Sequence, residues 1–175
     1  MFYVQTTGID KSLILCYNEK NKDCEVIFMK FGWINLFGAV IVIIMLMPNI
    51  IYAVRNKNQK NLCKNKFMNV IEQVGRYACI VLMWLPLLVW EFGFAGVTEM
   101  IIYLAGNGIM LAVYITVFIF YLNKKTVKRA MILAVLPACI FLLSGILLRH
   151  WLLVGFAAVF AVGHCCVTKK NAETV

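Results

Sequence analysis

The sequence predicts an all-α integral membrane protein, built as one bundle of five transmembrane helices. Of its 175 residues, 63% are hydrophobic and only 14% are charged, whereas about half of a soluble domain is apolar. A helix needs roughly 17–25 residues to cross a hydrocarbon core of about 30 Å, and five segments come near that length. We place the helices at about residues 34–54, 70–90, 100–122, 131–148 and 151–167, within a transmembrane domain of residues 31–168.

The distribution of charge orients this bundle. The net charge of +9 would suggest nucleic acid in a soluble protein, but the basic residues gather in two connections and the tail, so we expect no nucleic-acid partner. The second connection, "WEFGFAGVTEM", contains Glu91 and Glu99 and no Lys or Arg. The positive-inside rule therefore places the amino terminus outside and the carboxyl terminus in the cytoplasm. The basic residues are Arg55, Lys57, Lys60, Lys64 and Lys66 in the first connection, Lys124, Lys125, Lys128 and Arg129 in the third, and Lys169 and Lys170 in a cytoplasmic tail of residues 169–175.

Residues 1–30 are expected to form an extracellular extension. "SLILCYNEKNKDCEVIF" reads as two apolar strands around a polar turn, so Cys16 and Cys24 would face each other and form a disulfide outside the cell. Against this, "MKFGWINLFGAV" from Met29 is typical of the start of a polytopic protein, and no secretory signal precedes it. Two alternatives stay open with equal weight: residues 1–28 belong to the native protein, or they are a dispensable extension.

The first and second helices each present a polar face. On the first, Asn49 and Tyr52 share a face, and Pro48 frees a backbone carbonyl near Asn49. On the second, four polar side chains follow the i, i+3, i+4, i+7 spacing of one helical face. They are Asn69, Glu72, Gln73 and Arg76.

Two interpretations of this stripe on the second helix remain. The favoured one puts it at the cytoplasmic interface, with Arg76 reaching toward the headgroups and Tyr77 in the aromatic belt. The other turns the stripe into the bundle, where it would bind a small solute. That inner group would be Asn49, Tyr52, Glu72, Gln73 and Arg76. Pro86 is expected to kink the second helix.

The third helix has a similar seam, with Tyr103 and Asn107 further out than the inner group. Asn107 stands between two glycines in "AGNGIM". Many transporters form their substrate-binding site from a polar residue in a broken helix. More often, however, glycine beside asparagine serves to pack helices together.

The fourth and fifth helices are separated only by Arg149 and His150, which predicts a tight helical hairpin. Small residues recur along both helices, and we interpret them as packing surfaces. Those of the fourth helix are Ala130, Ala134, Ala138 and Gly145, and those of the fifth are Ala157 and Ala161. Pro137 is expected to kink the fourth helix.

Charged residues at the outer helix ends suggest a second polar cluster. Its members would be Glu91, Glu99, Arg149 and His150. The alternative is ordinary helix-end charge in water.

Metal and cofactor chemistry finds little support. "GHCCVTKK" brings His164, Cys165 and Cys166 together, but no CxxC or paired His/Cys spacing exists to hold a tetrahedral zinc. We therefore interpret His164 as an interfacial residue and predict no metal, no cofactor and no catalytic residue.

Part of the pattern resembles intramembrane proteases of the CAAX-processing type, which combine EExxxR, FxxxH and a later HxxxN-like motif. Glu72 to Arg76 has the ExxxR spacing, and Phe160 to His164 spells FxxxH. However, Ile71 stands where the other glutamate would be, and no histidine follows His164. The site would lack half of its groups, so we interpret this resemblance as chance.

From Met29 onward the chain resembles small polytopic membrane proteins of Firmicutes, of the clostridial type. The segments that carry the resemblance are "PNIIYA", "NKFMNVIEQVGRYA" and "LRHWLL". It implies a multi-pass protein of a bacterial cytoplasmic membrane and implies no particular activity. The frequent Lys, Asn and Ile fit an AT-rich bacterial genome.

The leading functional hypothesis is a small transport or transport-accessory protein in which the seams of the first three helices bind a solute. A structural or regulatory subunit, packing against another copy or a partner membrane protein, is the second alternative. An intramembrane enzyme is the third. The expected surroundings in every case are the lipid bilayer.

Overall fold

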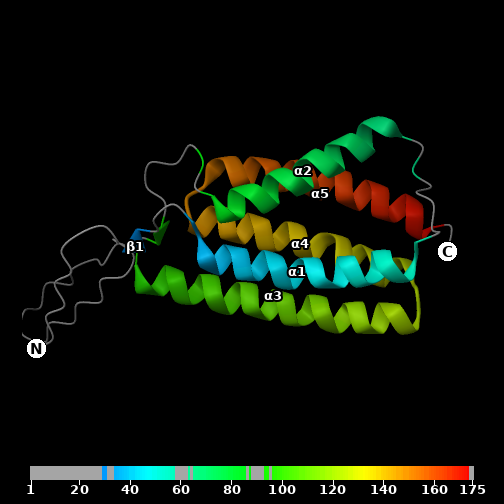
Figure 1. The fold of residues 1–175 in the computed structure, drawn as a ribbon, viewed down its shortest axis with the longest axis horizontal. Helices are drawn as coiled ribbons and strands as arrows, with labels where there is room; N and C mark the ends of the chain where they lie inside the picture. The colour runs from blue at the N-terminus through cyan, green and yellow to red at the C-terminus, as the bar shows by residue number, and fades with distance from the viewer. Residues whose placement is uncertain are drawn as a thin grey trace, which may run out of the picture.

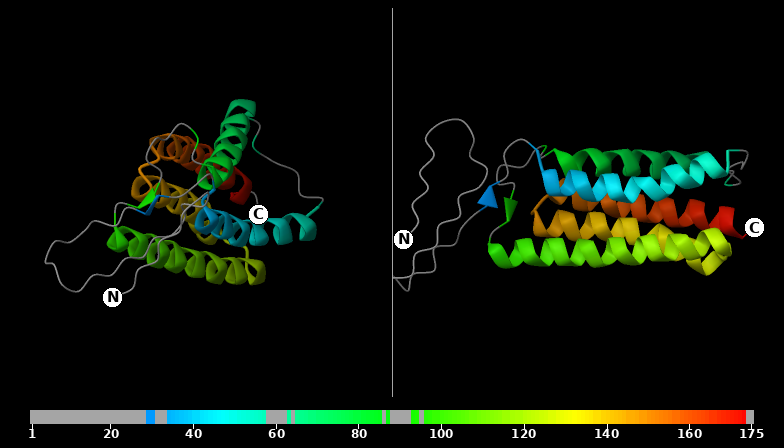
Figure 2. Two further views of the ribbon diagram at one scale, coloured as in Figure 1. Left: turned by 60° about the vertical axis from the view of Figure 1, so that its left-hand side comes forward. Right: turned by 60° about the horizontal axis from the view of Figure 1, so that its bottom comes forward.

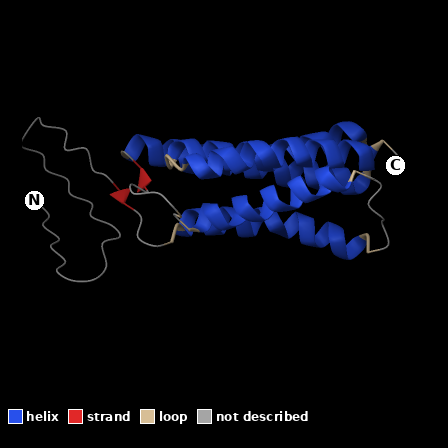
Figure 3. Cartoon of the chain, turned by 90° about the horizontal axis from the view of Figure 1, so that it is seen from above, coloured by secondary structure: helices blue, strands red, loops and turns tan. Residues whose placement is uncertain are grey.

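The computed structural model describes residues 29–30, 34–57, 63, 65–85, 87, 93–94 and 96–173. Five helices run side by side as one bundle, and two short strands lie at one end of it (Figures 1 and 3). The helices are α1 (Leu36–Arg55), α2 (Lys66–Trp84), α3 (Val97–Asn123), α4 (Val127–Leu147) and α5 (Trp151–Ala172). The strands β1 (Met29–Lys30) and β2 (Gly93–Phe94) pair antiparallel and tie the chain before α1 to the connection before α3. The cysteines of the predicted disulfide, Cys16 and Cys24, lie outside the described residues.

Four helices, α1, α3, α4 and α5, are long and apolar enough to cross a membrane. The structure thus supports an all-helical membrane bundle, but it supports four spans of the five predicted. The helix that falls short is α2, because Glu72, Gln73 and Arg76 interrupt its apolar run. It nevertheless lies along α5 within the bundle (Figure 1).

Successive helices alternate in direction, which separates the charges of the bundle (Figure 1). One end, here called the basic end, carries the carboxyl ends of α1, α3 and α5 and the starts of α2 and α4. The basic residues described there are Arg55, Lys57, Lys66, Lys124, Lys125, Lys128, Arg129, Lys169 and Lys170. The opposite end carries Glu99, Arg149 and His150. Because α5 continues to Ala172, the predicted tail of residues 169–175 begins as helix.

The two ends of α2 differ from the prediction of 70–90. Asn65 caps the helix by accepting hydrogen bonds from the backbone of Phe67 and Met68, so α2 starts at Lys66. It ends at Trp84, because Leu85 has extended angles of φ −111° and ψ 126°, as expected for a residue before proline. Pro86, which we expected to kink this helix, comes after its last residue in the sequence and lies outside the described residues.

The turn between α4 and α5 uses two residues. His150 N donates to Gly145 O at 2.8 Å and Arg149 N donates to Ile146 O at 3.1 Å, which is the Schellman pattern of helix termination. Arg149 has φ 54°, the left-handed conformation that glycine usually supplies in this motif. His150 Nδ1 then accepts a hydrogen bond from Leu153 N at 3.2 Å and caps α5. This geometry forms the tight hairpin expected from the sequence.

Helices α2 and α5 approach each other closely through two glycines. A Cβ atom on Gly75 would lie 2.8 Å from the Cα of Phe160, and one on Gly163 would lie 2.9 Å from the backbone N of Glu72. Both distances are too short for any larger side chain. The crossing therefore places Glu72 directly against the backbone of α5.

Helices α1 and α2 meet near the end of the bundle that lies opposite the basic end. Asn35 N donates to Trp84 O at 2.8 Å, and Gly38 packs against the carbonyl of Met83. From this point the two helices diverge toward the basic end (Figures 2 and 3). The polar face of α2 is thus not covered by α1 along its whole length.

The small-residue seam of α4 lies inside the bundle. Its residues Ala130, Ala134, Ala138 and Gly145 are buried, as is Ala157 on α5. Phe141, on the same helix, contacts Phe160 of α5, with the ring centroids 5.8 Å apart. These packing surfaces therefore hold α3, α4 and α5 together within one chain, and α4 remains a helix past Pro137.

Candidate functional site

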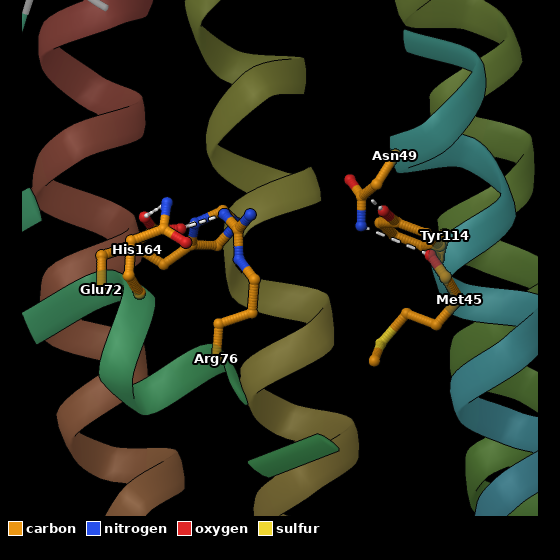
Figure 4. A network of polar contacts seen from close by, with 7 residues as sticks. Met45, Asn49, Glu72, Arg76, Tyr114 and His164 are labelled. Carbon is orange, nitrogen blue, oxygen red and sulfur yellow. Dashed lines mark hydrogen bonds and ion pairs between the residues drawn. The ribbon is translucent and has the colours of Figure 1, made fainter. Parts of the chain in front are cut away.

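The carboxylate of Glu72 is the centre of the best-formed polar site. Its side chain is only 4% exposed, and it accepts hydrogen bonds from three neighbours. Arg76 pairs with Oε1 from one turn further along α2, His164 Nδ1 lies 3.1 Å from the same oxygen, and Gln73 Nε2 donates to Oε2 at 3.1 Å. We call these four residues the inner polar cluster (Figure 4).

Several features of α5 hold His164 in this position. Phe160, one turn earlier, stacks on the imidazole with the ring centroids 4.8 Å apart and the planes 17° apart. Gly163 lets the α2 backbone approach closely enough for the imidazole to reach Glu72. Since Nδ1 faces the carboxylate, a neutral His164 can donate from Nδ1 and keep Nε2 as an acceptor.

The electrostatics of the inner polar cluster explain how a carboxylate is kept inside an apolar bundle. An unpaired charge in the membrane interior costs about 2.5–3.5 kcal/mol or more, and here the ion pair with Arg76 and two further hydrogen bonds offset that cost. The side chain of Arg76 is 35% exposed and that of His164 is 20% exposed. The cluster is therefore buried at its carboxylate and open at its cationic side.

A second polar pair joins α1 to α3. The hydroxyl of Tyr114 on α3 donates to Oδ1 of Asn49 on α1 at 3.3 Å, and Asn49 Nδ2 donates to Met45 O at 3.4 Å. In Figure 4 the guanidinium of Arg76 turns toward Glu72, and the Asn49–Tyr114 pair stands apart from it, with α4 behind the space between them. The bundle thus holds two polar groups, one between α2 and α5 and one between α1 and α3.

The structure joins part of the predicted inner group and separates the rest. Glu72, Gln73 and Arg76 are together, whereas Asn49 bonds to Tyr114 of α3. Tyr52 lies elsewhere: its ring centroid is 6.0 Å from that of Tyr121, and Lys125 Nζ lies 5.6 Å over the ring.

The structure adds His164, which we had interpreted as an interfacial residue, and Tyr114. The four residues of the partial protease match, Glu72, Arg76, Phe160 and His164, are in fact brought together. That spacing was the one sequence signal able to find His164.

Tyr103 and Asn107 belong to a different region. Both are fully buried, and Asn107 Nδ2 donates to Tyr103 O at 2.9 Å while Ser144 Oγ of α4 donates to Asn107 Oδ1 at 3.4 Å. Helix α3 runs unbroken through Asn107. The broken-helix hypothesis for "AGNGIM" is therefore wrong, and the asparagine joins α3 to α4.

The predicted outer cluster is only partly assembled. Arg149 Nη2 lies 3.7 Å from Glu99 Oε1, and both side chains are substantially exposed. His150 is fully buried, and burial lowers the pKa of its imidazole, opposed in part by hydrogen bonding to the Leu85 backbone. Glu91 lies outside the described residues. These contacts join helix ends and form no common site among the residues described.

Among the residues that the structure describes, no three His, Cys, Asp or Glu side chains are grouped so as to hold a metal ion. The free cysteines described are Cys63, Cys79, Cys139, Cys165 and Cys166.

These observations define the class of the protein: a multi-pass helical membrane protein with a charged cluster between its helices. Residues 15–136 match the family FIT, described as fat storage-inducing transmembrane protein. The match spans more than half of the chain, so the chain belongs to this family. No curated protein and no solved structure matches it. The resemblance to clostridial membrane proteins stays a prediction.

Proposed function

We propose that the protein binds one amphiphilic lipid of the bilayer and acts as a small transport or transport-accessory protein for it. The polar head of the lipid would contact Arg76 and His164, and its acyl part would remain among the apolar helices. The family description, which names fat storage, supports a lipid as the small solute that the seams suggested.

One observation carries this proposal: Arg76 is anchored on a buried carboxylate and still 35% exposed. A guanidinium carries five N–H donors in a fixed fork, and its Nη2 is bound to Glu72. The N–H groups that do not bind Glu72 remain for a ligand, and Asn49 and Tyr114 lie across from Arg76 in Figure 4. A head group with acceptor oxygens would meet a preoriented donor there, supplemented by the amide of Asn49.

The partial exposure of Arg76 supports a lateral approach from the bilayer. Helices α1 and α2 meet at Gly38 and Met83 and separate toward the basic end (Figure 2). A lipid that approached Arg76 from the side would keep its acyl chains in the membrane, so its apolar part would need no dehydration. The basic end, which we propose faces the cytoplasm by the positive-inside rule, would attract anionic heads as well. We also propose the bacterial cytoplasmic membrane as its location, which the composition supports.

Native mass spectrometry of the purified protein tests this proposal through the fraction that retains one lipid. Arg76→Gln should lower the affinity about tenfold to hundredfold, because a charge-assisted hydrogen bond contributes about 1.5–3 kcal/mol. Lys169→Gln, at the exposed end of α5, is the matched control for loss of one positive charge. Equal lipid retention in wild type and Arg76→Gln would refute the proposal.

The second alternative, a partner subunit that packs through the Ala and Gly faces, is less well supported. Ala134 and Ala138 of α4 and Ala157 of α5 are already covered by neighbouring helices of the same chain. A partner would therefore have to use other surfaces.

The third alternative, an enzyme, is favoured by one specific contact. The Glu72 carboxylate orients the His164 imidazole at 3.1 Å, the relationship that holds a general base in many hydrolases. His164 would then take a proton from a water molecule that attacks an ester or amide carbonyl. If it does, His164→Asn would abolish hydrolysis of a membrane-delivered nitrophenyl acyl ester while the protein stays folded. A wild-type protein that shows no turnover of this ester would argue for binding alone.

A further inference from the structure

The connection between α3 and α4 carries four positive charges within residues 124–129, at the basic end of the bundle (Figure 1). One of them is turned toward α1, because Lys125 Nζ donates to Asn56 Oδ1 at 3.1 Å. We call the other three, Lys124, Lys128 and Arg129, the basic corner. No ion pair among the described residues includes any of these three. Since residues 100–172 contain no Asp or Glu, this long stretch of chain supplies them with no counter-charge.

The guanidinium of Arg129 is held in a fixed orientation. Its Nη1 donates to Phe120 O at 2.9 Å and to Lys124 O at 3.0 Å, the last carbonyls of α3 and its cap. Its central carbon lies 5.8 Å over the ring of Phe120. A guanidinium has five N–H donors, so those of Nη2 and Nε remain for an acceptor. Arg129 is therefore a preoriented donor bound only to neutral groups.

The start of α4 adds to the positive charge of the basic corner. The backbone N–H groups at a helix N-terminus act as roughly half a positive elementary charge, and acidic side chains are stabilising there. The first turn of α4 has no acidic residue and contains Lys128 and Arg129 instead. An anion bound at the basic corner would offset both the helix dipole and the two side chains.

Exposed apolar side chains lie one turn deeper in the bundle than the basic corner. Phe120 precedes Lys124 by one turn on α3 and is 53% exposed, and Ile132 follows Arg129 by about one turn on α4 and is 45% exposed. Helix α3 has 27 residues, about 40 Å at 1.5 Å per residue, which exceeds a hydrocarbon core of about 30 Å. Its ends therefore reach the head groups, and the basic corner, which follows α3 directly, lies at that depth.

We propose that the basic corner binds the phosphate head of one anionic phospholipid in the leaflet at the basic end, with an acyl chain along Phe120 and Ile132. The planar fork of Arg129 matches phosphate oxygens, and the exposed ammonium groups of Lys124 and Lys128 add charge. A zwitterionic head is disfavoured because its own positive charge would meet these cations. A soluble phosphate has no chain to cover the apolar side chains. This site is distinct from the inner polar cluster and does not depend on the function proposed for Arg76.

Native mass spectrometry in an Arg76→Gln background tests the site without the inner polar cluster. The protein is titrated with phosphatidylglycerol and with phosphatidylcholine of the same acyl chains. Phosphatidylglycerol should bind about tenfold more tightly, and adding Arg129→Gln should remove this preference, because a charge-assisted hydrogen bond is lost. Adding Lys66→Gln, which removes an exposed charge at the start of α2, is the matched control and should preserve it. An equal preference with and without Arg129→Gln would overturn the proposal.

Photocrosslinking in membranes locates the lipid on the wild-type protein. A phosphatidylglycerol with a diazirine in one acyl chain should label Phe120 and Ile132 more strongly than the matching phosphatidylcholine does. Ile146, at the opposite end of α4 and 54% exposed, is the internal control and should be labelled equally by the two lipids. Equal labelling of Phe120 by the two lipids would overturn the proposal. Loss of the phosphatidylglycerol crosslinks in excess inorganic phosphate would also overturn it and would assign the basic corner to a soluble phosphate.

Discussion

The imidazole of His164 on α5 lies 3.1 Å from the carboxylate of Glu72 on α2, although 92 positions separate them in the chain. This contact joins α2, the least apolar helix of the bundle, to α5. It also makes Glu72 the one carboxylate in the described residues that is both buried and bound by two side chains with cationic forms. Stability and ligand binding should therefore depend on the same residue.

Glu72→Gln should destabilise the protein by about 1–3 kcal/mol, because it leaves Arg76 and His164 without a buried counter-charge. The value is below that of a fully buried pair, since Arg76 is partly exposed. The measurement is the free energy of unfolding in mixed micelles titrated with SDS. Glu99→Gln, which breaks the exposed pair with Arg149, is the control and should cost no more than about 1 kcal/mol. Equal losses in the two variants would contradict the structural role of Glu72.

The crossing of α2 and α5 should not tolerate a single added methyl group. Gly163→Ala places a Cβ atom 2.9 Å from the Glu72 backbone and should cost about 1–3 kcal/mol of unfolding free energy. The matched control is Gly155→Ala on the same helix, where a Cβ atom meets nothing within 4 Å; it should be neutral or slightly stabilising. If Gly163→Ala is as stable as Gly155→Ala, the helices do not approach as closely as described.

Replacing Arg149 should show the cost of its left-handed backbone. Both Arg149→Gly and Arg149→Ala remove the pair with Glu99, so the difference between them isolates the conformation at φ 54°. The glycine variant should be more stable than the alanine variant by about 1 kcal/mol. Thermal unfolding of the two variants under identical conditions measures the difference, and an alanine variant of equal stability would argue against the observed turn.

His150 should make the protein sensitive to mild acid. Burial lowers its pKa from the ordinary value of 6.5. As the pH falls below 6.5, the imidazole is therefore protonated in the unfolded chain before it is protonated in the folded protein. Stability is therefore complete above about pH 6.5 and should fall as the pH drops from there toward the folded pKa. His150→Asn keeps an acceptor for the α5 cap and should reduce this dependence, as measured by the unfolding midpoint between pH 7.5 and 5.5. An unchanged pH profile in that variant would assign the acid sensitivity to other groups.

Thiol labelling of single cysteines, in an otherwise cysteine-free protein in membranes, should separate the two polar regions. Positions 49 and 73 are exposed in the structure, whereas Tyr103 and Asn107 are fully buried. Cysteines replacing Asn49 and Gln73 should react with a water-soluble maleimide, and those replacing Tyr103 and Asn107 should not. Silent cysteines at all four positions, with reactive ones in the basic connections, would mean that the inner polar cluster is not reached by water.

Much of this fold follows from patterns that are local in the sequence. The apolar segments, the one-turn spacing of Glu72 and Arg76, and the short link at Arg149 and His150 are local patterns, and the structure shows each of them. The end of α2 was also encoded locally, because Pro86 restricts Leu85, but a long apolar run obscured it.

The parts that could not be predicted depend on contacts between distant segments. Gly163 resembles Gly155 in the sequence, yet only Gly163 faces another helix. His164 joins Glu72 only because that crossing exists, and Tyr52 pairs with Tyr121 and not with its predicted partners. Small and polar residues on apolar helices therefore indicate that contacts exist without identifying their partners.

The two-residue turn between α4 and α5 also bears on how the protein is made. The Schellman bonds of Arg149 and His150 and the cap from His150 satisfy the helix ends within the turn, so the hairpin is closed largely by its own hydrogen bonds. We expect the ribosome-bound chain to deliver α4 and α5 to the membrane as one preassembled hairpin. A later step would then close α5 on α2, so that a helix synthesised later secures an earlier and less hydrophobic one in the bilayer.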